Sequence, residues 1–143
     1  MSFPQHFWNL SNHSVKKSWP DTQRAAAEAW AGHSRPLILE DVPFPQIDPE
    51  MDSKRVGELA QEFVSNLEAR GCRQGEPILV QGEFTFVVAI VPLLQLIGLV
   101  PLCATSRRMG CEVLEPDGTV TKAYRFEFAM FREYISYPIG PTS

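Results

Sequence analysis

The chain has 143 residues, a length that suits one domain with a sizeable buried core. Its net charge of -4 argues against a protein that holds duplex nucleic acid through a strongly basic surface. The three cysteines lack metal-ligand spacing, and no positively charged segment with a following apolar core opens the chain. We therefore expect a reduced, cytoplasmic protein.

The N-terminal quarter of the chain predicts a strand followed by a helix. Residues 7–10 are mostly apolar and run into the polar turn 11–14. Ser18 is suited to the N-cap of a helix with Pro20 in its first turn. The alanine-rich run that follows is expected to continue this helix to Gly32.

A second strand and helix follow. The strand is expected over residues 37–42, and the prolines after it favour an extended loop. Asp52 or Ser53 can cap the next helix, whose apolar residues recur at i, i+3, i+4 and i+7 as far as Gly71. This spacing predicts one apolar stripe packed on the sheet.

Two short apolar runs, residues 77–80 and 100–104, flank a longer apolar segment that begins at Phe84. Two buried strands joined by an apolar helix are typical of a βαβ unit with a parallel sheet. The segment 84–103 is the one stretch that resembles a membrane span, but Pro92 and Pro101 divide it into a helix and a strand. We expect no membrane insertion.

The C-terminal part of the chain changes pattern. Residues 111–115 and 119–128 predict a β-hairpin around the turn 116–118, which should extend one edge of the sheet. Alternation places Tyr124, Phe126, Phe128 and Met130 on one face. Residues 131–134 are expected to form either a flap over a ligand or the end of an edge strand, and residues 138–143 are expected to form a tail.

These elements predict one Rossmann-like domain spanning residues 1–143, with its core at about 7–134. It has a mainly parallel sheet, flanking helices and a C-terminal β-hairpin. In such sheets ligands bind beyond the carboxyl ends of the strands, where polar turns meet. Three turns are expected there: residues 11–13, Gly82-Glu83 with Thr85, and residues 105–108.

The residues in these turns favour recognition of a phosphate or phosphodiester. Hydroxyls, amides and helix N-terminal N–H groups bind phosphate oxygens, and paired arginines add bidentate donors. Histidine side chains ordinarily titrate near neutrality, so His13 is the first candidate for a general acid or base, with Glu83 as the alternative. Each residue also has a structural interpretation: Asn12 as a turn former, Glu83 as a helix-start acid and Arg107 on a solvated surface.

Recognised nucleotide and metal motifs are absent from the sequence. It contains no glycine-rich phosphate loop, no Walker sequence, no Gly-x-Ser-x-Gly elbow and no His-Glu-x-x-His helix. The histidines and cysteines show no ligand spacing, so we expect neither a metal site nor a cofactor.

Four short segments together resemble small stand-alone CRISPR-associated proteins of the CARF-like group, some of which are ring nucleases. The resemblance spans roughly residues 7 to 134. Its motifs are Asn9-Leu10-Ser11-Asn12-His13, Gly82-Glu83-Phe84-Thr85, Ala104-Thr105-Ser106-Arg107-Arg108, and the segment from Phe126 to Tyr134.

The resemblance implies an antiviral homodimer that binds cyclic oligoadenylate, most simply cyclic tetra-adenylate, across its two-fold axis. Ring nucleases cleave this messenger of type III CRISPR systems without a metal, by attack of a ribose 2'-hydroxyl on the adjacent phosphate. Such a reaction needs phosphate donors and a proton donor for the leaving oxygen. The candidate catalytic residues are His13, Glu83 and Arg107. The candidate ligand-binding residues are Ser11, Asn12, Gly82, Thr85, Thr105, Ser106, Arg108 and Arg132.

Two other functions remain open from the sequence. The same crevice can serve a non-catalytic sensor or sponge for a cyclic nucleotide. Alternatively, the chain is a small Rossmann-like enzyme for another phosphorylated metabolite, although its length leaves little room for a separate substrate domain.

Overall fold

The computed structural model describes residues 5–32 and 36–137. The predicted tail at 138–143 lies outside these residues. Five strands form one sheet in the order β2-β1-β3-β4-β5. They are β1 (Gln5–Ser11), β2 (Leu37–Pro43), β3 (Pro77–Val80), β4 (Val100–Leu114) and β5 (Val120–Glu133).

The first four strands run parallel, and β5 pairs antiparallel with β4 at one edge. The fold is the Rossmann-like α/β arrangement that the sequence predicted. From β1 the chain proceeds to β2 on one side, whereas β3, β4 and β5 follow on the other. The strand order therefore reverses between β1 and β3, which is the position of the ligand crevice in open α/β sheets.

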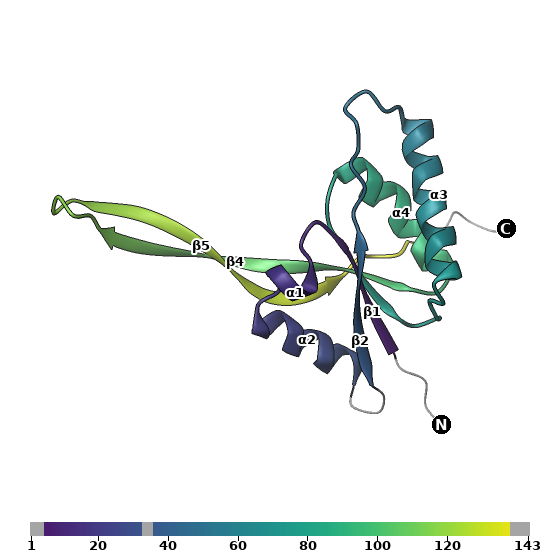
Figure 1. Ribbon diagram of the computed structural model, residues 1–143, viewed down its shortest axis with the longest axis horizontal. Helices are drawn as coiled ribbons and strands as arrows, with labels where there is room; N and C mark the ends of the chain where they lie inside the picture. The colour runs from purple at the N-terminus through teal and green to yellow at the C-terminus, as the bar shows by residue number, and fades with distance from the viewer. Residues whose placement is uncertain (1–4, 33–35, 138–143) are drawn as a thin grey trace.

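Helices cover both faces of the sheet (Figure 1). The short α1 (Val15–Ser18) and α2 (Asp21–Ala31) lie on one face, and α3 (Ser53–Ala69) and α4 (Phe84–Leu96) lie on the other. Trp8, Ile78 and Ile90 belong to the larger core under α3 and α4, whereas Phe7 and Leu79 belong to the core under α1 and α2. Within the described residues, no helix has the length and apolar character needed to cross a membrane.

Local sequence explains where the two long helices begin. The Asp52 carboxylate accepts the Arg55 N–H at 2.8 Å and caps α3, as one of the two predicted caps. The Glu83 carboxylate accepts the N–H groups of Thr85 and Phe86 and caps α4. The helix-start interpretation of Glu83 is therefore the one that the structure shows.

The prediction that Ser18 caps a helix is wrong. Ser18 is the last residue of α1, whose N-cap is Ser14, and α2 begins only at Asp21 after Pro20. The Ser14 hydroxyl accepts the Lys17 N–H at 3.2 Å, which closes a separate helical turn. Pro20 is extended and supplies no side-chain cap, so the two helices stay distinct.

The prediction of a turn at residues 105–108 is also wrong. These residues continue β4, which runs to Leu114 because β5 offers an antiparallel partner from Leu102 onward. The predicted turn 116–118 is confirmed, with Asp117 accepting the Thr119 N–H at 2.9 Å. As a result β4 and β5 extend beyond the body as a long two-stranded ribbon (Figure 1).

A β-bulge changes which side chains of β5 share a face. The register shifts between Thr105 and Ser106, so that Ser106 lies opposite Phe128 and Thr105 lies opposite Met130. Phe128 and Phe131 therefore both pack on the α1–α2 side, although they are three residues apart. Met130 does not share the face of Phe126 and Phe128, contrary to the alternation that the sequence suggested.

Candidate functional site

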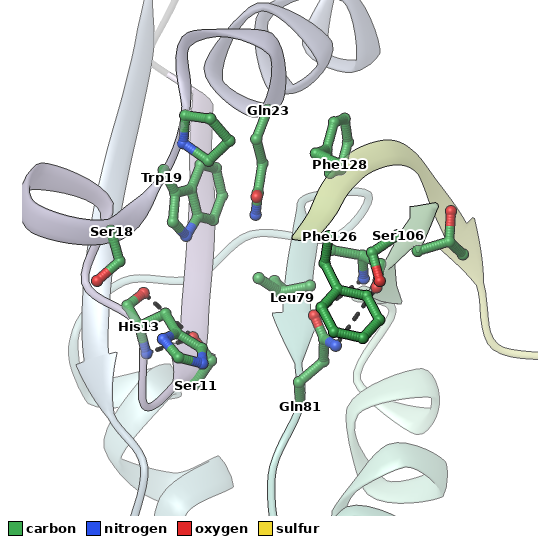
Figure 2. Close-up of a pocket in the computed structure, with 13 residues that line it drawn as sticks. Ser11, His13, Ser18, Trp19, Gln23, Leu79, Gln81, Ser106, Phe126 and Phe128 are labelled. Atoms are coloured by element: carbon green, nitrogen blue, oxygen red, sulfur yellow. Dashed lines mark hydrogen bonds between the residues drawn. The ribbon is translucent and has the colours of Figure 1, made fainter. Parts of the chain in front are cut away.

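A cleft of about 370 Å³ opens at the carboxyl ends of β1 and β3 and beside β4, on the face that α1 and α2 cover (Figure 2). Polar and apolar side chains both line it. Trp19 forms one side, Leu79 lies at its base, and Phe126 and Phe128 form the other side. The cleft lies at the edge where the strand order reverses, so the predicted location of the site is the place where the structure has a cavity.

A hydrogen-bond network fixes the turn after β1. Ser11 Oγ donates to Asn9 Oδ1 at 2.7 Å and accepts the His13 N–H at 3.2 Å. The buried Asn9 amide donates to the His13 carbonyl at 2.7 Å and to Asp41 Oδ1 at 2.8 Å. The Asp41 carboxylate also accepts the Val15 N–H at 3.1 Å. Together these bonds hold the His13 backbone in place, while its exposed imidazole faces the cleft.

Gln81 fixes the opposite side of the cleft. Its amide oxygen accepts the Ala104 N–H at 3.0 Å, and its amide nitrogen donates to the Ala104 carbonyl at 3.4 Å. The side chain thereby supplies the backbone partner that β4 loses where β3 ends at Val80. This pairing fixes β4 just before Thr105 and Ser106, which also line the cleft.

Trp19 is 6% exposed, and its indole Nε1–H has no acceptor in the described part of the chain. A buried N–H without a partner is costly and calls for a bound water or ligand. The Gln23 amide points into the cleft from α2 and makes no hydrogen bond with another described residue. Trp19 and Gln23 thus offer hydrogen-bonding capacity that the fold itself does not use.

Four of the predicted site residues lie together in the cleft, namely Ser11, His13, Thr105 and Ser106. Their roles differ. Ser11 orders the turn, and the Thr105 hydroxyl accepts the Met130 N–H at 3.2 Å at the bulge. The His13 imidazole and the Ser106 hydroxyl have no hydrogen-bond partner among the described residues, so they remain available to a ligand.

The predicted residues at the start of α4 do not line the cleft. The Glu83 carboxylate is occupied by the Thr85 hydroxyl at 2.7 and 2.6 Å, in addition to its helix-cap bonds. These hydrogen bonds lower the pKa of the Glu83 carboxyl below its ordinary value. Gly82 lies against the Phe44 ring, which would collide with any Cβ at this position. This segment is organised to begin a helix.

The arginines and Asn12 are also placed outside the cleft. Arg108 shares the strand face of Ser106, and its guanidinium lies 3.7 Å from the centroid of the Tyr124 ring on the ribbon. Arg107 and Arg132 lie on the opposite face, because adjacent strand residues alternate. Asn12 borders a separate hollow. The structure therefore does not bring Glu83 or Arg107 to His13.

One protein-family model, described as Uncharacterized protein MJ1673 family, matches residues 5–132. The chain belongs to this family. Neither the curated proteins nor the solved structures gave a significant match. In this MJ1673-family chain the match covers the cleft and nearly all of the ribbon.

The sequence did not reveal nine of the residues that line the cleft. Gln81 follows β3 directly, and this position was the signal that could have identified it. The aromatic alternation of β5 marked an exposed face but not its approach to the cleft. Trp19 and Gln23 gave no signal, since they belong to an ordinary helical region. The nine residues are Ser18, Trp19, Pro20, Gln23, Leu79, Gln81, Ala104, Phe126 and Phe128.

Among the described residues that line this cleft there is no aspartate, glutamate, lysine or arginine. A bare phosphate would find no positive partner at its base. A flat heteroaromatic ring finds aromatic walls for stacking together with unpaired amide, hydroxyl and indole groups at its edge. Within the described residues, no group of three histidine, cysteine or acidic side chains is placed to hold a metal ion.

Proposed function

We propose that the cleft binds the adenine base of a cyclic oligoadenylate. The observation that carries this proposal is an uncharged, aromatic-walled cleft whose free polar groups suit a purine. A glutamine amide can pair with the N6 and N7 edge of adenine, and Gln23 presents such an amide. Trp19 Nε1, buried without an acceptor, offers a donor for a ring nitrogen.

The sugar and phosphate would then lie at the mouth of the cleft, beside the exposed His13 imidazole. We assign His13 the transfer of a proton in a metal-independent cleavage. The 2'-oxygen forms a bond to the adjacent phosphorus as its proton leaves, and the bond from phosphorus to the 5'-oxygen breaks. The products carry a 2',3'-cyclic phosphate and a 5'-hydroxyl group. This reaction would end a type III CRISPR signal in the cytoplasm.

The size of the cleft favours a homodimer with a ring-shaped ligand. At about 370 Å³ it lies near the lower end of small-molecule sites, so it suits one nucleotide rather than a whole ring. A cyclic tetra-adenylate that fills one cleft leaves its remaining bases outside. A second protomer related by a two-fold axis offers the same cleft to the opposite base.

The test measures binding and cleavage of cyclic tetra-adenylate in the presence of EDTA. Wild-type protein should bind the ring and convert it to linear di-adenylate, as separated by chromatography. Gln23→Ala should weaken binding roughly tenfold or more, because it removes a two-bond base contact. Gln61→Ala, which removes the same side chain from an exposed position on α3, is the matched control and should bind as wild type.

His13→Ala should bind the ring but lose cleavage. Equal binding by the Gln23→Ala and wild-type proteins would refute the assignment of the base to this cleft. Absence of both binding and cleavage in the wild type would refute the proposed ligand.

A non-catalytic sensor is the second candidate, and one placement favours it. Glu83 and Arg107, the other two candidate catalytic residues, lie outside the cleft, and Glu83 already caps α4. A histidine alone provides fewer of the charges that stabilise a phosphoryl transition state. Tight binding with an intact ring after hours at equimolar protein would select the sensor over the nuclease.

A further inference from the structure

Within residues 5–32 and 36–137, the ribbon formed by the outer parts of β4 and β5 has no third strand. Beyond Ser106, β4 pairs with β5 alone, and in the described chain β5 has no second neighbour. The nine residues from Ser106 to Leu114 span about 30 Å at the usual rise of an antiparallel strand. Figure 1 shows this ribbon projecting away from the helices.

One face of the ribbon exposes several large apolar side chains beside the charged Arg108, Glu112 and Lys122. Phe126 is 71% exposed, and Tyr124, Leu114 and Val120 are also exposed on the same face. A two-stranded ribbon is marginally stable in water, and a long edge with apolar side chains readily pairs with another strand. The ribbon therefore has the properties of a surface that is covered in the working protein.

We propose that the outer edge of β5 pairs antiparallel with β5 of a second copy of this chain, with the two-fold axis at Phe126. Phe126 then lies opposite the partner's Phe126, and Tyr124 lies opposite the partner's Phe128. On the other face, Arg125 lies opposite the partner's Glu127, and the contact repeats by symmetry. Aromatic pairs and opposite charges are the cross-strand neighbours that stabilise a sheet.

Charge selects this register over its neighbours. Moving the axis by one residue toward the N-terminus places Arg125 opposite the partner's Arg125. Moving it by one residue in the other direction places Glu127 opposite the partner's Glu127. Both shifts set like charges directly against each other, which destabilises strand pairing. The sequence of β5 around Phe126 is complementary to itself when two copies run antiparallel. We therefore assign a second copy of this chain as the partner strand.

The outer edge of β4 is a weaker candidate for the same contact. An axis at Gly110 would set Arg108 against the partner's Glu112, but it would bring two glycines together at the centre and no aromatic pair. Arg108 is also already placed over the Tyr124 ring. The β5 edge instead uses its exposed aromatic side chains.

This pairing would join the two sheets and place both clefts on the same side. An axis perpendicular to the sheet keeps the α1–α2 faces of the two protomers together. Phe126 lines the cleft of its own protomer and would meet the partner's Phe126 at the axis. A continuous aromatic strip would then connect the two clefts. The interface rests on the ribbon and not on the identity of the ligand.

Sedimentation equilibrium of the ligand-free full-length chain tests the interface. Wild type should be a dimer, and Arg125→Glu and Glu127→Arg should each raise the dimer dissociation constant roughly tenfold or more, since two pairs turn from opposite to like charge. Lys54→Glu, an equal charge reversal on an exposed position of α3, should leave the constant unchanged.

An equimolar mixture of the two β5 variants should restore dimerisation, because Arg and Glu again face each other in the mixed dimer. The mixture cannot restore the Arg125–Glu127 ion pair within one chain, which is 2.9 Å long in the wild type. Restoration therefore reports the contact between chains, and it also shows that both variants are folded. A monomeric wild type, a dimer insensitive to both variants, or a mixture that stays dissociated would overturn the proposal.

Discussion

The strongest stability prediction concerns Glu76, a buried carboxylate at the amino end of β3. Its oxygens accept the backbone N–H groups of His6 and Arg73, both at 2.6 Å, and the indole N–H of Trp8 at 3.2 Å. Glu76→Ala leaves these three donors without their acceptor. A single unsatisfied buried donor costs about 1–3 kcal/mol, and here three donors lose one acceptor group together. We therefore expect a loss of about 4 kcal/mol.

Urea unfolding followed by circular dichroism measures this loss. A domain of this size has an unfolding free energy of about 5–15 kcal/mol, so the variant should unfold at much lower urea with an unchanged slope. Glu28→Ala, on an exposed position of α2, is the control and should stay within about 0.5 kcal/mol of wild type. A loss below about 1 kcal/mol for Glu76→Ala would refute the reasoning, because it would mean that water replaces the carboxylate freely.

Three further changes test other contacts by thermal or urea unfolding. Tyr134→Phe removes the 2.7 Å hydrogen bond to the Val80 carbonyl and should cost about 1 kcal/mol. Burial raises the pKa of Tyr134 to about 12, so wild type should lose stability between pH 10 and 12 while the variant does not; an equal loss in both would contradict this origin. Glu83→Ala should destabilise at neutral pH, and the difference from wild type should shrink in acid, because the pKa of this carboxyl is lowered in the fold; a pH-independent difference would count against the cap. Gly82→Ala should cost about 1–3 kcal/mol, since its Cβ meets the Phe44 ring, and wild-type stability would show that the ring moves freely.

The hydrophobic pattern and the capping residues were enough to predict most of the fold. Continuous apolar runs identified the parallel strands, and the spacing after Asp52 identified α3, because these signals are local and repeat along the chain. Glu83 had two interpretations from sequence, and the structural one depended on Thr85 and Phe86 only two and three residues away. When the alternative role of a residue depends on neighbours this close in the chain, that alternative can be predicted from the sequence.

Local sequence patterns did not predict the contacts between segments that lie far apart in the chain. Residues 105–108 look like a turn because they are polar, yet pairing with β5 some twenty residues later makes them a strand. The Asn9 bonds to His13 and Asp41, and the Gln81 bonds to Ala104, likewise join separate elements. A polar residue after a strand predicts the edge of the sheet at which it lies. It does not predict whether its side chain binds a ligand or completes the fold.

The bulge beside Thr105 connects the cleft to the ribbon. Without the extra residue in β5, strict alternation would place Phe128 and Phe131 on opposite faces, and one of them would leave the core under α2. With it, Phe131 packs beside Phe7 and Trp19, while Phe128 and Phe126 continue outward along the same face. The aromatic residues of β5 that close the cleft and those that face a second copy therefore lie on the same surface. A ligand in the cleft that contacts Phe126 would touch the edge at which two protomers are proposed to meet, so ligand binding and dimerisation should each strengthen the other.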